Sequence, residues 1–240
     1  MTIWAVLPAA GVGRRMGSAI PKQYLSLGET PLLVHSLRRL ASIDAIRRIA
    51  VVTHPDDSHW PALAESLQPE LGDRLLSVAG GDERYQSVLN GLGALGPYAK
   101  SDDWVLVHDA VRPCVRRMDI EKLIHTLEPN SIGGLLGSKM DNTVKRVDTD
   151  NAIVETLDRE TLWNALTPQM FRFGLLIEAL EAVVASGAAV TDEAAAMETA
   201  GHRPIMVAGS KDNIKITHEA DLEQAQQILA AQALEAGEQR

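Results

Sequence analysis

Short apolar runs recur along the chain, and segments with the spacing of amphipathic helices separate most of them. One such segment begins at Thr30 and Pro31, which suit an N-cap and the first position of a helix. Leu33, Leu37 and Leu40 then fall on one helical face. The apolar runs have the length of buried strands, which we predict at residues 3–7, 49–53, 75–79, 104–108, 132–136 and 205–207.

Strands that alternate with helices form a mostly parallel sheet with helices on both faces. We therefore predict a single Rossmann-like α/β domain over residues 1–240. Ligands of such sheets bind beyond the carboxyl ends of the strands, and the motifs described below follow predicted strands. Later helices are predicted at about 175–184, 192–200 and 219–234, the last with Thr217 as its N-cap.

One stretch interrupts this alternation. Between residues 139 and 157, two short alternating runs flank a polar turn at 148–151. This pattern predicts a β-hairpin that projects as an arm. Because an isolated two-stranded hairpin is only marginally stable in water, we expect the arm to pack on another surface, and a partner subunit is a reasonable candidate.

Composition limits the classes of function. The chain has 240 residues, of which 45% are hydrophobic and 23% charged, as in an ordinary globular protein. A net charge of -9 and a pI near 5.3 disfavour general binding to nucleic acid or anionic membranes, so an anionic substrate requires a local cationic pocket. Cys114 is the only cysteine, and the sequence has neither an obvious signal peptide nor a membrane span; we expect a cytoplasmic protein.

The first predicted strand runs into a glycine-rich loop with a local excess of positive charge. Glycines at positions 11, 13 and 17 let the backbone approach an anion closely and direct N–H groups at it. Arg14, Arg15 and Lys22 follow the strand, and the segment 1–28 contains no Asp or Glu. In an acidic protein, this reversal of sign predicts an anion site.

Two familiar nucleotide-binding loops do not fit this segment. The dinucleotide motif G-x-G-x-x-G requires a third glycine where Met16 stands, and an acidic residue about 20 positions later. The pattern G-x-x-x-x-G-K-[ST] is also absent from the sequence. The loop is therefore either a phosphate-binding loop of a third kind or a simple tight turn.

Two further motifs follow predicted strands. Gly80 and Gly81 suit the close approach of a flat ligand, with Ser87 near the start of the next helix, or they form a plain turn. Asp109 ends the strand at 104–108, and Arg112 follows it. A carboxylate is a suitable ligand for Mg²⁺ and a guanidinium suits phosphate, although the two residues also fit a capping aspartate with its ion-pair partner.

Together these segments resemble the 2-C-methyl-D-erythritol 4-phosphate cytidylyltransferase family of the sugar-phosphate nucleotidyltransferases. The resemblance rests on the segment 8–16, on Pro-Lys-Gln-Tyr at 21–24, on Gly-Gly-x-x-Arg-x-x-Ser at 80–87 and on His-Asp-Ala-Val-Arg-Pro at 108–113. Val111 replaces an alanine of the family pattern. The resemblance extends to residue 217, and it implies a homodimer clasped by the arms.

The resemblance also implies a reaction. The phosphate of 2-C-methyl-D-erythritol 4-phosphate attacks the α-phosphorus of CTP, and pyrophosphate leaves, in the non-mevalonate route to isoprenoid precursors. A phosphate monoester has a second pKa of about 6 and is largely ionised at neutral pH, so this nucleophile needs no general base. The scattered histidines, without a zinc-binding or hydrolase motif, agree with such a reaction.

Specific site residues follow from the same resemblance. Arg15 and Lys22 are expected to stabilise the charge that develops on the α-phosphate, and Gly81, Asp82 and Ser87 to recognise the base. Mg²⁺ is the expected cofactor, with Asp109 and Asp212 as its protein ligands. The expected CTP-binding residues are Pro8, Ala9, Ala10, Gly11, Gly13, Met16, Gly81, Asp82, Ser87 and Asp109.

A second set of residues is expected to hold the acceptor. Arg159 and Lys215 are implied to orient its phosphate, and Arg112 and Thr143 to reach it across a dimer interface, while Thr167 and Thr191 complete the set. Most of them have a simpler interpretation: charged hairpins are usually solvated edges, Lys215 fits an exposed strand lysine, and Thr191 fits a helix N-cap.

Two other functions remain open at this stage. A ribitol 5-phosphate cytidylyltransferase would share the glycine-rich loop and the His-Asp motif, so the acceptor is the less certain half of the reaction. A non-catalytic nucleotide-binding module would share the loop alone.

Overall fold

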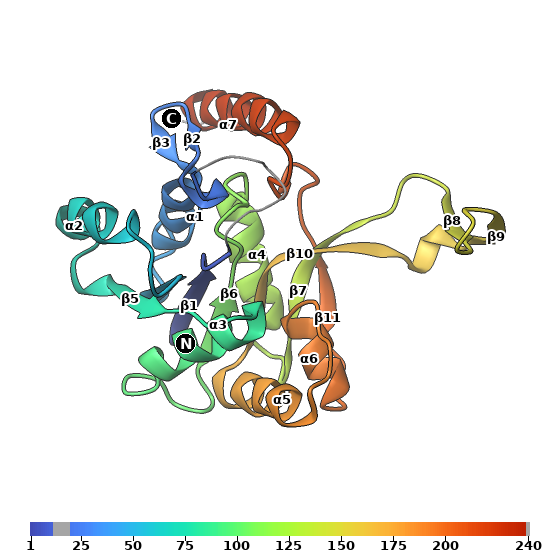
Figure 1. The fold of residues 1–240 in the computed structure, drawn as a ribbon, viewed down its shortest axis with the longest axis horizontal. Coiled ribbons are helices and arrows are strands. Elements are labelled where there is room, and N and C mark those ends of the chain that lie inside the picture. The colour runs from blue at the N-terminus through green and yellow to red at the C-terminus, as the bar shows by residue number, and fades with distance from the viewer. Residues whose placement is uncertain (12–19, 239–240) are drawn as a thin grey trace.

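The computed structural model describes residues 1–11 and 20–238. Within them, a seven-stranded sheet has the order β11-β7-β10-β6-β1-β4-β5 (Figure 1). Its strands are β1 (Ile3–Pro8), β4 (Ile46–Thr53), β5 (Leu75–Ala79), β6 (Trp104–Val107), β7 (Gly133–Lys139), β10 (Trp163–Arg172) and β11 (Ile205–Ala208). β10 runs antiparallel to both of its neighbours, and the other neighbouring pairs are parallel. The predicted α/β domain with a mostly parallel sheet is confirmed.

Helices cover both faces of the sheet because alternate residues of its central strands point to opposite sides. On β1, Ile3, Ala5 and Leu7 join one buried cluster, and Trp4 and Val6 join another. A strand buried on both faces appears in the sequence as a continuous apolar run. The first face carries α1 (Leu32–Ala41), α2 (Trp60–Leu71) and α4 (Arg117–Leu127), and the second carries α3 (Arg84–Leu95), α5 (Phe173–Ser186) and α6 (Glu193–Thr199).

The last helix, α7 (Ala220–Glu238), lies over a smaller cluster at one end of the molecule (Figure 1). Its start differs from the prediction. The Thr217 hydroxyl does not cap the helix but donates to a carbonyl two residues earlier, and the Asp221 carboxylate accepts the Thr217 N–H instead. Likewise, Thr30 and Pro31 do not begin α1; they form β3 (Thr30–Pro31), which pairs with β2 (Ser26–Leu27).

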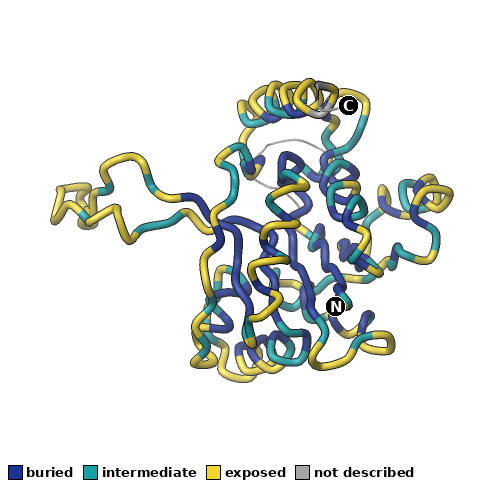
Figure 2. Tube along the Cα trace, turned by 180° about the vertical axis from the view of Figure 1, so that it is seen from behind, coloured by how far each residue is buried: buried dark blue, intermediate teal, exposed yellow. Residues whose placement is uncertain are grey.

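The predicted hairpin is present. β8 (Val144–Val147) pairs antiparallel with β9 (Ile153–Leu157), and both project from the body between β7 and β10 (Figure 1). The arm is exposed along its length, as Figure 2 shows, and Ile153 and Val154 are 65% and 62% exposed. Exposed apolar side chains on a two-stranded sheet that projects from the described body of the chain are typical of a surface that meets another molecule.

The contact between α3 and the sheet predicts a difference between two glycines of one helix. A Cβ at Gly91 would lie 2.6 Å from a methyl of buried Val6, whereas a Cβ at Gly93 would meet nothing within 4 Å. We expect Gly91→Ala to lower the free energy of unfolding by roughly 1–2 kcal/mol through overpacking, and Gly93→Ala to raise it by up to about 1 kcal/mol. Urea unfolding at constant m-value measures both changes, and equal effects at the two positions would contradict the packing described.

Candidate active site

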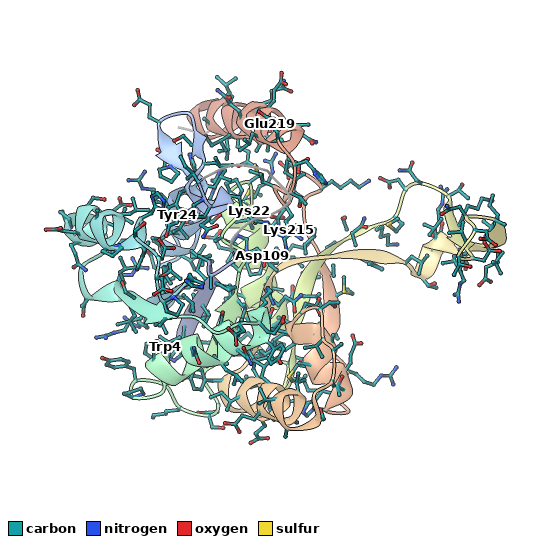
Figure 3. The ribbon with its side chains drawn as sticks, viewed as in Figure 1. Trp4, Lys22, Tyr24, Asp109, Lys215 and Glu219 are labelled. Atoms are coloured by element: carbon teal, nitrogen blue, oxygen red, sulfur yellow. The ribbon has the colours of Figure 1, made fainter. Side chains whose placement is uncertain are left out.

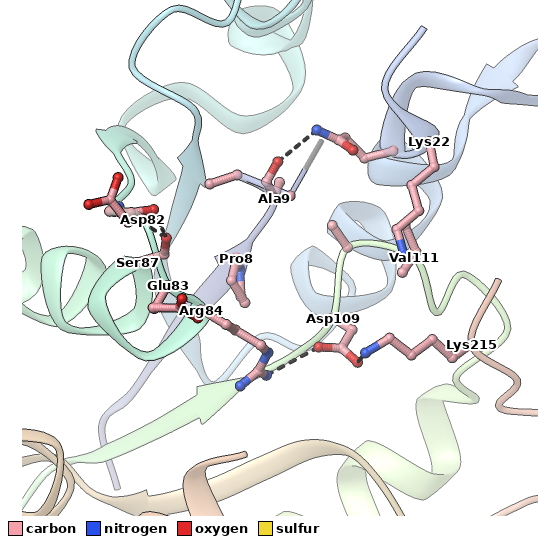
Figure 4. Close-up of a pocket in the computed structure, with 15 residues that line it drawn as sticks. Pro8, Ala9, Lys22, Asp82, Glu83, Arg84, Ser87, Asp109, Val111 and Lys215 are labelled. Carbon is pink, nitrogen blue, oxygen red and sulfur yellow. Dashed lines mark hydrogen bonds and ion pairs between the residues drawn. The ribbon is translucent and has the colours of Figure 1, made fainter. Parts of the chain in front are cut away.

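A cavity of about 180 Å³ opens beyond the carboxyl ends of β1, β5 and β6 (Figure 4). The predicted binding motifs follow these three strands. Lys22, Asp109 and Lys215, which come from distant parts of the chain, converge near the centre of the molecule (Figure 3). All eight described CTP-binding candidates line this cavity: Pro8, Ala9, Ala10, Gly11, Gly81, Asp82, Ser87 and Asp109. The remaining candidates of that set, Gly13 and Met16, lie outside the described residues, as does Arg15.

The segment after β1 is fixed by hydrogen bonds to its neighbours. The Ala9 N–H donates to Val52 at 2.7 Å, and the buried Gln23 amide donates to the Ala9 carbonyl, also at 2.7 Å. Gln23 belongs to η2 (Lys22–Tyr24), a short 3₁₀ helix, so this bond places Lys22 beside the loop. The Lys22 side chain extends along the cavity toward Val111 (Figure 4).

Gly81 lines the same cavity, and Gly80 packs directly behind it. A Cβ at Gly80 would lie 2.7 Å from the Ala10 side chain and 2.9 Å from the Ser87 hydroxyl, so only glycine permits this close approach of two loops. The Gly81 N–H donates to the Ser87 hydroxyl at 3.1 Å. The predicted base-recognition residues are therefore held together at the start of α3.

Asp109 is the electrostatic centre of the cavity. Its side chain is only 8% exposed, and three cations contact it: Arg84 at 3.1 Å on one oxygen, and Arg112 at 3.2 Å and Lys215 at 3.0 Å on the other. Burial alone would raise the pKa of Asp109, but the three positive charges outweigh it and hold the pKa far below its ordinary value. Asp109 is therefore a carboxylate at neutral pH.

A buried histidine holds the segment that carries Asp109. Thr167 accepts the Asp109 N–H at 3.1 Å, and its hydroxyl lies 2.9 Å from His108 Nδ1. His108 Nε2 lies 3.1 Å from the Arg112 carbonyl, so the threonine donates to Nδ1 and Nε2 donates to the carbonyl. Burial lowers the pKa of His108 to about 4, which keeps the ring neutral. Thr167, expected at the acceptor, thus also supports the Asp109 segment.

His108 predicts a dependence of stability on pH. The unfolded chain, with a histidine pKa of about 6.5, binds a proton between pH 6.5 and 4 that the folded chain does not. The free energy of unfolding should therefore fall as the pH is lowered through this window, by at most roughly 3 kcal/mol from this group. Urea unfolding should show a flatter pH profile for His108→Gln than for the wild type. His125→Gln, which alters an exposed histidine of α4, should keep the wild-type slope.

A second, smaller cavity of about 150 Å³ adjoins the first and gathers the acceptor candidates of the body: Arg112, Thr167, Thr191 and Lys215. Arg84, Asp109 and Lys215 line both cavities and form a shared wall between them. Lys215 lies in a loop and not on the strand that its alternation with isoleucines predicted. Its ion pair with Asp109 also shows that it is not a simple solvated surface lysine.

Two acceptor candidates, Thr143 and Arg159, are separate from this group. Both lie on or next to the arm, and the Arg159 guanidinium donates to the backbone carbonyl of Asp141. The described part of the chain does not bring either residue to the cavities, because the arm projects away from the body (Figure 1). Arg112, which we grouped with Thr143 as a contact across an interface, lies buried beside Asp109, and its role at an interface stays a prediction.

The two predicted metal ligands are also in different surroundings. One oxygen of Asp212 contacts Arg116 and Gln232, at 2.8 Å and 3.1 Å, and Asp212 lines neither cavity. Among the described residues, no group of three or more His, Cys, Asp or Glu side chains is placed to hold a metal ion. Mg²⁺ is commonly held by one carboxylate together with phosphates of the substrate. The site fits the ion in this way alone, and Asp109 would be the carboxylate.

Two site residues were not predicted. Arg84 lines both cavities, and Glu193 at the start of α6 contacts Arg84 through both oxygens, at 2.5 Å and 3.2 Å. The arginine of the Gly-Gly-x-x-Arg-x-x-Ser segment was a signal for the first residue. Glu193 follows Thr191 in a segment that resembles the family, but no sequence spacing indicates that it meets a residue 109 positions away.

Comparison with known proteins identifies the family of the chain. Residues 3–231 match the family model described as 2-C-methyl-D-erythritol 4-phosphate cytidylyltransferase. A protein of that name from Hahella chejuensis is 47% identical over 227 residues, covering 95% of this chain and 92% of the relative. One from Shewanella amazonensis is 46% identical over 231 residues, covering 96% and 94%. In the described part of the chain, no helix has the length and apolar character to span a membrane.

Solved structures show the same fold. The crystal structure of 2-C-methyl-D-erythritol 4-phosphate cytidylyltransferase from Francisella tularensis matches with a TM-score of 0.79 at 35% identity, covering 95% of this chain and 100% of the other. A 4-diphosphocytidyl-2C-methyl-D-erythritol synthase from Anaerococcus prevotii matches with a TM-score of 0.81 at 28% identity, covering 95% and 98%. The chain therefore belongs to the 2-C-methyl-D-erythritol 4-phosphate cytidylyltransferase family.

Proposed function

We propose that this protein transfers a cytidylyl group from CTP to 2-C-methyl-D-erythritol 4-phosphate, giving the CDP-linked polyol and pyrophosphate. The observation that carries this function is the shared wall: the CTP candidates and the acceptor candidates occupy adjoining cavities separated by Arg84, Asp109 and Lys215. Relatives of that name cover nearly the whole chain. The product supplies an activated precursor for isoprenoid synthesis, and a cytoplasmic location agrees with the single, buried thiol of Cys114.

In this reaction, an oxygen of the acceptor phosphate forms a bond to the α-phosphorus of CTP while the bond from that phosphorus to the pyrophosphate oxygen breaks. Both reactants are anions, so the protein contributes chiefly positioning and stabilisation of charge. Backbone groups at 8–11 hold the triphosphate, and Gly81, Asp82 and Ser87 hold the base. Lys22, with Arg15, stabilises the charge on the α-phosphate, and Arg112 and Lys215 attract the acceptor phosphate.

Mg²⁺ completes the proposed site. Asp109 is the one described carboxylate that lines the cavity at its cationic end, and it would hold the ion together with the phosphates of CTP. When bound, the ion neutralises charge on the triphosphate. We do not assign Asp212 to the ion, because it contacts Arg116 and Gln232 and is not among the residues that line either cavity.

A homodimer would complete the acceptor site. The body supplies Arg112 and Lys215, whereas Thr143 and Arg159 project on the arm, away from the cavities of their own chain. We propose that the arm of one subunit reaches the body of its partner, which would bring both sets to one phosphate. The exposed apolar residues of the arm support this arrangement.

The reaction is tested by pyrophosphate release from CTP. We expect release to require both 2-C-methyl-D-erythritol 4-phosphate and Mg²⁺, and to be much slower when ribitol 5-phosphate replaces the acceptor or ATP replaces CTP. Faster release with ribitol 5-phosphate would assign the other acceptor. Binding of CTP without release in any combination would identify a non-catalytic nucleotide-binding module.

A further inference from the structure

We propose that Glu193 is a positioning residue for cytidylyl transfer: it holds the Arg84 guanidinium against Asp109 and so fixes the wall that the two cavities share. The inference rests on the function proposed above. Glu193 itself lines neither cavity, as the described residues define them, so it acts through Arg84 and not by touching a substrate.

The geometry is a chain of three charges. Glu193 is 1% exposed, and its two oxygens accept hydrogen bonds from Arg84 Nη1 at 2.5 Å and from Nη2 at 3.2 Å. Arg84 Nη2 also donates to Asp109 Oδ1 at 3.1 Å. A guanidinium that contacts one carboxylate with two nitrogens has a fixed plane, whereas a single contact to Asp109 would leave it free to turn.

Hydrogen bonds fix the segment that carries Glu193. At the start of α6, the Asp192 side chain accepts the Ala195 N–H at 2.9 Å. The buried Gln169 side chain of β10 donates to Asp192 at 2.9 Å and accepts the Ala194 N–H at 2.8 Å. The position of Glu193 is thus set by β10, the strand that also holds the Asp109 segment through Thr167.

Charge gives a further reason for this arrangement. Burial alone would lower the pKa of Arg84, but Glu193 and Asp109 outweigh it and raise the pKa above its ordinary value. Without Glu193, Asp109 would be the one remaining carboxylate partner of Arg84 among the described residues, and Asp109 already contacts two other cations. Arg84 would then turn toward a bound phosphate or toward solvent, and the wall between donor and acceptor would lose its fixed shape.

A structural role alone makes a different prediction. A buried ion pair contributes little net stability in many proteins, and breaking one mainly leaves an unpaired charge. If Glu193 served only folding, its replacement would lower the free energy of unfolding and leave kcat of the folded enzyme unchanged. A positioning role lowers kcat, because a small misplacement of reacting groups can cost up to about 10²-fold in rate.

The test compares Glu193→Gln with Glu198→Gln, which removes an exposed carboxylate from the same helix. In a pyrophosphate-release assay with CTP and 2-C-methyl-D-erythritol 4-phosphate, we expect Glu193→Gln to lower kcat by roughly 10- to 10²-fold while the Kd for CTP changes by less than about threefold. Glu198→Gln should match the wild type. Should Glu193→Gln fold poorly, Glu193→Asp keeps the charge but shortens the reach, and it should retain the fold with reduced kcat.

A double-mutant cycle then separates action through Arg84 from any other role. In an Arg84→Gln background, Glu193→Gln should cause little further loss of kcat, because its effect passes through the missing guanidinium. Additive losses, or a normal kcat in a destabilised Glu193→Gln enzyme, would overturn the inference. Absence of transfer in the wild type and in Glu198→Gln alike would instead overturn the proposed function, and the inference with it.

Discussion

Lys22→Ala is expected to lower kcat by roughly 10²- to 10³-fold, the scale for losing one preorganised donor from a charge-stabilising site. Lys22 lines the nucleotide cavity, and its neighbour Gln23 fixes η2 to the loop after β1 through the Ala9 carbonyl. We therefore expect its ammonium to lie beside the α-phosphate when the base binds next to Gly81, across the same cavity. Because the charge on that phosphate grows during the reaction, the loss should affect kcat more than the affinity for CTP.

Steady-state kinetics at saturating CTP and acceptor measure kcat, and calorimetry measures the affinity for CTP. Lys100→Ala is the matched control. Lys100 precedes β6 and Asp109 follows it, so the two residues lie at opposite ends of this strand. It should leave kcat unchanged. An unchanged kcat in Lys22→Ala would remove Lys22 from the mechanism, and a loss confined to CTP affinity would make it a binding residue alone.

The fold could be predicted from the sequence wherever the spacing of hydrophobic residues shows which segments are buried. β1, β6 and most of β4 are buried on both faces, so they appear as continuous apolar runs, whereas β5 lies at the edge of the sheet and is only partly buried. β10 does not follow this rule and was not predicted. Its buried residues include Thr167 and Gln169, which are polar because they hold the Asp109 segment and the start of α6. A strand that supports a site thus resembles a loop in sequence.

The same reasoning explains which parts of the site were predicted. Loop residues that directly follow parallel strands, such as Gly81 and Asp109, meet at one edge of the sheet whatever the details of packing. No comparable rule predicts from the sequence which side chains on different elements form a pair. The contact of Arg84 with Glu193 joins α3 to α6, and the hydrogen bond that holds Asp109 comes from an antiparallel strand. These contacts depend on tertiary packing, which local spacing does not encode.

Arg159→Ala and Lys215→Ala are each expected to lower kcat/KM for the acceptor by roughly 10- to 10²-fold, the cost of one charge-assisted contact to phosphate, with CTP affinity preserved. The two residues lie on the arm and in the body of the same chain. Arg146→Ala removes another cation from the arm, one that is paired with Glu155 on the neighbouring strand, and it should leave acceptor use unchanged. Loss of CTP binding in Arg159→Ala would contradict the division of the site into two cavities, since Lys215 lines both of them and Arg159 lines neither.

A mixed dimer decides whether the arm acts on its own body or on that of its partner. In a purified heterodimer of one Arg159→Ala chain and one Lys215→Ala chain, action across the interface leaves one site with both cations and the other with neither, so acceptor-limited activity should reach about half that of the wild type. Action within one chain leaves each site with one cation, and the heterodimer should then be no more active than its parents. A protein that sediments as a monomer at the assay concentration, yet transfers cytidylyl groups at full rate, would remove the arm of a partner from the acceptor site altogether.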